Sequence, residues 1–125
     1  MHKVEDLKIW QKSIALAKQV YKVVASLPNE EKYGLSSQIK RCAVSIASNI
    51  AEGAGRNSNK EFKYFLSIAN GSSYELHTQL ILTYELNLID KQSIDELLLL
   101  IVEIQKMNYS FQKSLENVSI LNTKI

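Results

Sequence analysis

Residues 35–56 read LSSQIKRCAVSIASNIAEGAGR, and their pattern is the strongest indication of the fold. Apolar residues recur in it mainly at spacings of three and four, so that at 100° per residue they share one face of a helix. These residues are Leu35, Ile39, Cys42, Ala43, Ile46 and Ile50. Gly34 precedes the stretch, and Gly53 or Gly55 can adopt the left-handed backbone that ends a helix. The sequence therefore predicts one amphipathic helix between Gly34 and this glycine pair.

The opposite face of the same predicted helix is polar. Six hydrogen-bonding side chains fall within a sector of about 80°, and we name them the polar stripe: Gln38, Arg41, Ser45, Asn49, Glu52 and Arg56. One interpretation is a solvated face with an ion pair between Arg56 and Glu52 at i,i+4 spacing. The other is a binding surface that suits RNA, because arginine binds phosphate and amide side chains bond to bases and sugar hydroxyls.

Toward the N-terminus, a first helix is predicted from a cap at Asp6 as far as Pro28. It carries two apolar lines. One comprises Leu7, Trp10, Ile14, Ala17, Tyr21 and Val24, and the other comprises Ile9, Leu16, Val20, Val23 and Leu27. Together they are wider than a bundle helix buries, so part of the second line is expected to lie between subunits. The residues expected there are Ile9, Leu16, Val20 and Val23.

Toward the C-terminus, Ser58 with Glu61 three residues later is a capping box that opens a third helix. Asn87 is a plausible left-handed residue at its end. Gly71 lies inside this helix, where glycine costs about 1 kcal/mol relative to alanine. We therefore expect close packing or a local bend at Gly71.

A fourth helix begins at Ser93, which forms a capping box with Glu96, or at Asp90. Its apolar run Leu97–Val102 points in every direction around the helix, so one subunit buries only part of it. Leu98, Leu99 and Val102 are expected to lie between subunits. The tail after about Asn117 is expected to fray.

Composition agrees with long helices, because the 125 residues contain one Pro and four Gly. We predict an all-α protein in which residues 1–125 form a single antiparallel up-down-up-down four-helix bundle. One cysteine cannot form an internal disulfide, and the sequence shows neither a signal peptide nor an apolar run of about 20 residues that could span a membrane. A cytoplasmic location and no membrane association are the expectation.

The net charge is only +2, but it is unevenly distributed. Residues 1–28 hold five lysines against two acidic residues, which gives this part +3. The candidate basic helix comprises Lys8, Lys12, Lys18 and Lys22. Such lysines usually serve solubility, and they can also supply contacts to phosphate.

Residues for catalysis or metal binding are sparse. His77 is the only internal histidine and Tyr74 stands three residues before it, so the Glu-x-x-His pairs of di-iron bundles are missing. Gly53-Ala54-Gly55 lacks the lysine of a phosphate-binding loop. Cys42 falls on the apolar face, where a thiol is a small core residue. We expect no enzymatic activity, no catalytic residues, no metal site and no cofactor.

Four blocks of the sequence carry a family resemblance: DLKIWQK at 6–12, YGLSSQIKR at 33–41, SNIAEG at 48–53 with Gly55-Arg56, and EFKYFLSIANGS at 61–72. In this order they resemble the bacterial 23S rRNA-intervening-sequence proteins over about residues 4–116. The resemblance implies a left-handed four-helix bundle that assembles as a homopentamer, with no assigned catalytic residues. A distant similarity to the accessory protein of diversity-generating retroelements supplies an analogy for RNA binding. Ala47 stands where family members often have proline, which removes a kink point.

Two hypotheses about function follow. The first is a non-enzymatic homo-oligomer that holds structured RNA or a ribonucleoprotein partner through the polar stripe and the basic helix. The alternative is a scaffold or partner-binding bundle with no nucleic-acid role. A salt series separates them, because affinity that depends on phosphate contacts falls steeply with salt.

Overall fold

The computed structural model describes the backbone of residues 3–124 and the side chains of residues 3–116. Four long helices and two short 3-10 turns account for nearly all of this part, and no β-strand occurs in it. The helices are α1 (Lys8–Val24), α2 (Leu35–Ala54), α3 (Asn59–Glu85) and α4 (Lys91–Lys124), and the turns are η1 (Val4–Asp6) and η2 (Asn29–Glu31). The side chains after Glu116 lie outside the described residues, so the fraying expected after about Asn117 stays a prediction.

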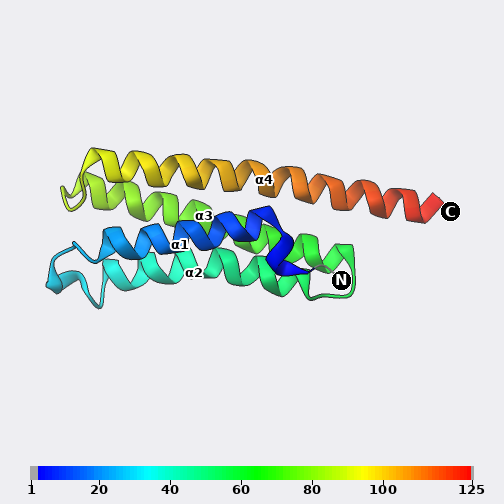
Figure 1. Cartoon of the computed structure of the whole chain (residues 1–125), viewed down its shortest axis with the longest axis horizontal. Coiled ribbons are helices and arrows are strands. Elements are labelled where there is room, and N and C mark those ends of the chain that lie inside the picture. Colours follow the sequence, from blue (N-terminus) through cyan, green and yellow to red (C-terminus); the bar gives the residue numbers. More distant parts are fainter. Residues whose placement is uncertain (1–2, 125) are drawn as a thin grey trace.

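The helices pack side by side and reverse direction at each connection (Figure 1). α1 contacts α2 and α4, and α3 contacts the same two helices, which closes the bundle. α4 is the longest helix and extends beyond the other three toward the C-terminus (Figure 1). The predicted all-α, up-down-up-down bundle is confirmed. Within the described chain, none of the helices combines the length and the apolar character that crossing a bilayer requires.

Two of the predicted helix boundaries rest on side-chain caps. Ser58 Oγ accepts a hydrogen bond from the Glu61 backbone N–H at 3.1 Å and thereby caps α3. Asp90 Oδ1 accepts from the Ser93 N–H at 2.7 Å, so Asp90 rather than Ser93 begins α4. Asn87 has a φ of 60° and is the left-handed residue that follows α3, as predicted.

Two other boundary predictions are wrong. Asp6 lies in η1, and the N-cap of α1 is Leu7, whose side chain makes no capping hydrogen bond. At the end of α2, Gly55 has a φ of −84°, and none of the described glycines has a positive φ. Neither Gly53 nor Gly55 therefore ends α2 by the left-handed conformation.

The two helical glycines differ in their surroundings. A Cβ added to Gly53 would lie 2.8 Å from Phe62 Cδ1 and 2.9 Å from Phe65 Cβ, so the end of α2 approaches the start of α3 too closely for any side chain. A Cβ on Gly71 would meet no atom within 4 Å, and α3 continues through this residue. The prediction of close packing at Gly71 is wrong; the close approach lies at Gly53.

The burial of apolar side chains on α1 differs from the prediction. Ile9, Leu16 and Val20 are at most 2% exposed within a single chain, so they belong to the core of the bundle and not to a contact between subunits. Their face also contains the buried Ser13, whose hydroxyl donates to the Ile9 carbonyl at 2.8 Å. Because this face of α1 includes a serine, hydropathy alone did not identify it as the face that packs into the core. Val23 is half-buried and packs against the core.

Candidate functional site

The polar stripe follows α2, but it does not form one continuous surface. Its four outer members, Gln38, Arg41, Glu52 and Arg56, are exposed. Its two central members are half-buried and engaged in hydrogen bonds. Ser45 Oγ lies 3.0 Å from Ser72 Oγ on α3, and Asn49 Nδ2 donates to the Ser45 carbonyl at 2.9 Å and to Ser45 Oγ at 3.0 Å. The centre of the stripe thus joins α2 to α3 and separates two outer regions.

The first region is a groove between α1 and α2, of about 490 Å³, which we name the Tyr21 groove. It is lined by Tyr21, Ser37, Lys40, Arg41, Val44 and Ser45. The Tyr21 ring is 46% exposed, and Lys40 Nζ lies 5.1 Å from its centroid in a cation–π contact. Arg41 and Ser45 of the polar stripe therefore share a surface with an accessible aromatic ring.

The candidate basic helix contributes unequally to this surface. Lys8, Lys18 and Lys22 are exposed, whereas Lys12 pairs with Glu103 of α4 at 2.8 Å and helps to hold α1 against α4. Lys18 lies three residues before Tyr21, which places both on neighbouring parts of the helix surface. Positive charge from Lys18 and Lys22 on α1 accompanies that of Lys40 and Arg41 on α2.

The second region lies at the corner between α2 and α3. The predicted pair is present, with Arg56 Nη2 2.7 Å from Glu52 Oε1, and the guanidinium lies 4.8 Å from the Phe65 ring centroid. A pocket of about 690 Å³ opens beside this pair and also exposes Glu61. Two carboxylates and one guanidinium make its charge negative, which suits a phosphate poorly.

Cys42 is buried, as predicted for a core thiol. Its Sγ donates a hydrogen bond to Glu75 Oε2 at 3.2 Å. Burial first, then the hydrogen bond and charge of Glu75, raise the pKa of the Cys42 thiol to about 12. The thiol is therefore protonated near neutral pH.

His77 is half-buried, and its Nδ1 has no hydrogen-bond partner among the described residues. No group of three or more His, Cys, Asp or Glu side chains with the arrangement of a metal site occurs in the part of the chain that the structure describes. His77 is not assigned a chemical role.

Sequence reasoning missed two features. Tyr21 has the period of an apolar line but lines the groove, because Ser37, Lys40, Arg41, Val44 and Ser45 of α2 lie beside this face of α1. It also missed a polar cluster between α3 and α4 around Asn108, which is only 2% exposed. The available signal was that Asn108 lies four residues after Ile104, on the core face of α4.

The fold and the polar grooves between its helices define the chain as an antiparallel helical-bundle protein. The profile of the family described as 23S rRNA-intervening sequence protein matches residues 5–110, and the chain belongs to this family. No curated protein matches the chain.

Among solved structures, the chain is similar to a protein of unknown function from the S23 ribosomal protein family of Bacteroides thetaiotaomicron VPI-5482. The two are 28% identical with a TM-score of 0.78, and the match covers 84% of this chain and 98% of the other. The similarity extends to nearly the whole of the Bacteroides protein, so the two share the complete bundle.

Proposed function

We propose that this protein is a non-enzymatic, self-associating bundle that binds single-stranded regions of RNA in the Tyr21 groove. The observation that carries the proposal is the exposed Tyr21 ring of α1 beside two cationic side chains of α2, Lys40 and Arg41, which line the groove with it. The family description refers to the intervening sequences of 23S rRNA, which makes RNA a natural class of partner to test. The proposed location is the cytoplasm, where RNA is present and a thiol such as Cys42 stays reduced.

The groove matches the chemistry of an unpaired nucleotide. Aromatic rings stack on bases that a duplex would hide, so the partner is a loop, a bulge or a single strand. Arg41 and Lys40 supply phosphate contacts, and the hydroxyls of Ser37 and Ser45 can bond to sugars. The negatively charged corner at Glu52 and Glu61 is outside this binding surface.

The test is the affinity for a fluorescent 12-nucleotide oligouridylate over a salt series. Tyr21→Ala should weaken binding by about 1–3 kcal/mol, whereas Tyr21→Phe should retain most of the affinity because it keeps the stacking ring. Arg41→Ala should weaken binding and make the salt slope shallower by about one unit. Lys106→Ala, which removes an exposed charge of α4 outside the groove, is the matched control.

Arg56→Ala tests how far the binding surface extends. Arg56 lies in the separate corner pocket, so the groove proposal expects unchanged affinity, while recognition along the whole polar stripe expects a loss similar to that of Arg41→Ala. Wild-type protein with no salt-sensitive affinity for the oligonucleotide would rule out the RNA proposal in favour of the protein-only scaffold.

Apolar surface supports the self-association part of the proposal. Leu99 is 74% exposed in the third turn of α4, and Leu82 and Leu86, near the end of α3, are 49% and 53% exposed. Large apolar side chains exposed to this degree are the ones that contacts between proteins cover. A second copy of the chain is the proposed occupant, and the resemblance described above implies a ring of five.

A further inference from the structure

A second polar pocket, open to solvent, lies between α3 and α4, the pair of helices that does not form the Tyr21 groove. We name it the Asn108 pocket; it has a volume of about 370 Å³, within the range of small-molecule sites. Lys63 and Asn70 face it from α3, and Tyr109, Gln112 and Glu116 face it from α4. It shares no residue with the Tyr21 groove.

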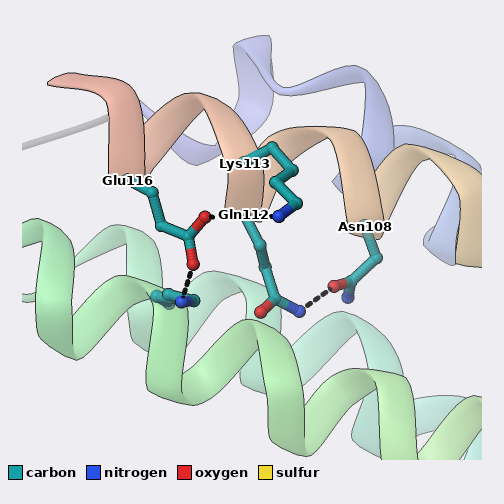
Figure 2. A network of polar contacts seen from close by, with 5 residues as sticks. Asn108, Gln112, Lys113 and Glu116 are labelled. Carbon is teal, nitrogen blue, oxygen red and sulfur yellow. Dashed lines mark hydrogen bonds and ion pairs between the residues drawn. The ribbon is translucent and has the colours of Figure 1, made fainter.

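The base of this pocket is organised by a buried amide. Asn108 Nδ2 donates to the Leu66 carbonyl of α3 at 2.9 Å, and Asn108 Oδ1 accepts from Gln112 Nε2 at 2.6 Å. Figure 2 shows the Gln112 side chain extending from α4 toward α3, with its nitrogen bound to Asn108. Because this bond fixes the orientation of the amide, Gln112 Oε1 remains as a positioned acceptor.

The amide of Asn70 lies in the same pocket on α3. Its side chain makes no hydrogen bond to another residue within the described part of the chain. An amide offers both a donor and an acceptor. Together, Gln112 and Asn70 present the kind of hydrogen-bonding edge that recognises a nucleobase.

Two lysines lie against the same carboxylate at the rim of the pocket. The Glu116 carboxylate bonds to Lys63 of α3 and lies 3.8 Å from Lys113 Nζ of α4 (Figure 2). The hydrogen bond from Lys63 is the main cause that lowers the pKa of Glu116, which keeps it ionised. Two lysines from different helices thus hold an anionic group, and Glu116 occupies the place that the anion of a ligand would take.

An aromatic ring completes the rim. Tyr109 is 66% exposed, and Lys113 Nζ lies 5.6 Å from its ring centroid. A flat aromatic surface beside lysines that hold an anion is the combination with which proteins bind a base and its phosphate. Glu116 is itself partly exposed, so its side chain can turn toward solvent when another anion replaces it.

We propose that the Asn108 pocket binds a single nucleotide, whose phosphate displaces the Glu116 carboxylate from Lys63 and Lys113. The base stacks on Tyr109, and Gln112 and Asn70 bond to its edge. The same chemistry is found in a free mononucleotide and in a nucleotide within an RNA chain, so the test separates these two sources.

The first arm is calorimetric titration of the full-length protein with AMP, UMP, adenosine and inorganic phosphate. One of the two mononucleotides should bind at least about tenfold more tightly than adenosine or phosphate alone, because each of these lacks one of the contacts. If neither AMP nor UMP bound more tightly than phosphate, the nucleotide assignment would be overturned. No heat from either mononucleotide, with wild-type protein and with Glu116→Gln, would overturn the site.

The second arm uses variants at the rim. Glu116→Gln removes the competing negative charge and should tighten mononucleotide binding by about tenfold. Lys63→Ala should weaken it by about tenfold, while Lys60→Ala, which removes an exposed lysine of α3 outside the pocket, should leave it unchanged. An equal loss in both lysine variants would mean unspecific attraction of anions and would contradict the proposal. Circular dichroism checks that each variant is folded.

The third arm identifies the source of the nucleotide. A 5′-phosphorylated oligonucleotide is titrated into the Tyr21→Ala variant, in which the Tyr21 groove is impaired. Retained binding that Lys63→Ala abolishes assigns the pocket to a nucleotide of an RNA chain, and binding of mononucleotide alone assigns it to a free nucleotide. Failure of the Tyr21 groove is seen with Tyr21→Ala and Arg41→Ala, whereas failure of the pocket is seen with Lys63→Ala and Glu116→Gln.

Discussion

At Cys42, burial determines the chemistry of a side chain that could otherwise react. The thiol lies on the core side of α2 and donates to Glu75, and its pKa is raised to about 12. Thiolate, not thiol, is the attacking species in disulfide exchange. A folded protein at pH 8 therefore presents almost no reactive sulfur, because that pH is far below the raised pKa.

The first prediction concerns the rate of this reaction. At pH 8, an aromatic disulfide reagent should modify folded Cys42 on the order of a hundredfold more slowly than Cys42 in guanidinium-unfolded protein. Glu75→Gln should leave the reaction slow, because burial is the largest cause of the raised pKa. Absorbance of the released thiol measures both rates, and rapid modification of the folded wild type would contradict the assignment.

The second prediction also belongs to single residues and compares two asparagines. Asn108 is buried and bonded to Leu66 and Gln112, so Asn108→Ala should lower the free energy of unfolding by about 1–3 kcal/mol. Asn70→Ala is the control, since Asn70 is half-buried and its amide has no such bonds; a change within about 0.5 kcal/mol is expected. Urea denaturation gives both values, and equal effects would disprove the structural role of Asn108.

At the scale of the helix, glycine has opposite effects on stability at two positions. Gly53 is required where α2 approaches Phe62 and Phe65, whereas the Cβ position of Gly71 is open. Glycine in a helix interior is entropically unfavourable and lowers stability relative to alanine. It is needed only where packing leaves no room for a side chain. Packing supplies that requirement at Gly53 only.

The third prediction follows from this contrast. Gly53→Ala should destabilise the bundle by about 1–3 kcal/mol, because the new methyl group forces α2 and α3 apart. Gly71→Ala should stabilise it by about 0.5–1 kcal/mol through helix propensity. Denaturation midpoints of the two variants should therefore move in opposite directions relative to wild type, and a stabilising Gly53→Ala would show that the close approach is absent in solution.

At the scale of the whole molecule, the exposed leucines provide a test of the proposed association between copies of the chain. Leu99 is largely exposed, whereas the neighbouring Leu98 packs partly against the core. Leu99 is therefore the better probe of an interface, because its replacement leaves the core of the single chain intact. Sequence periodicity alone did not distinguish the two leucines.

The fourth prediction concerns the assembly. Wild-type protein at micromolar concentration should be oligomeric by light scattering, with five copies expected from the family resemblance. Leu99→Asp should dissociate the oligomer and retain helical circular dichroism, while Leu98→Asp should also lower the melting temperature because it disturbs the core. A monomeric wild type would remove the self-association part of the proposed function.

The four helices and several of their ends were predictable from the amino-acid sequence. Ser58 and Asn87 were placed correctly because capping hydrogen bonds and left-handed residues depend on groups within a few positions along the chain. The 3.6-residue period likewise needs no knowledge of distant segments. The Glu52–Arg56 pair was predictable for the same reason, since both residues lie on one helix surface.

The face of each helix that contacts each neighbour was not predictable from the sequence and is seen in the folded bundle. Two apolar lines on α1 had equally good periods, and the positions of α2 and α4 made Ile9, Leu16 and Val20 the core while leaving Tyr21 at the surface. The Tyr21 groove and the Asn108 pocket each combine residues from two helices that are distant in sequence. Such sites depend on the rotation of each helix about its axis, which is set by side-chain packing across the whole bundle.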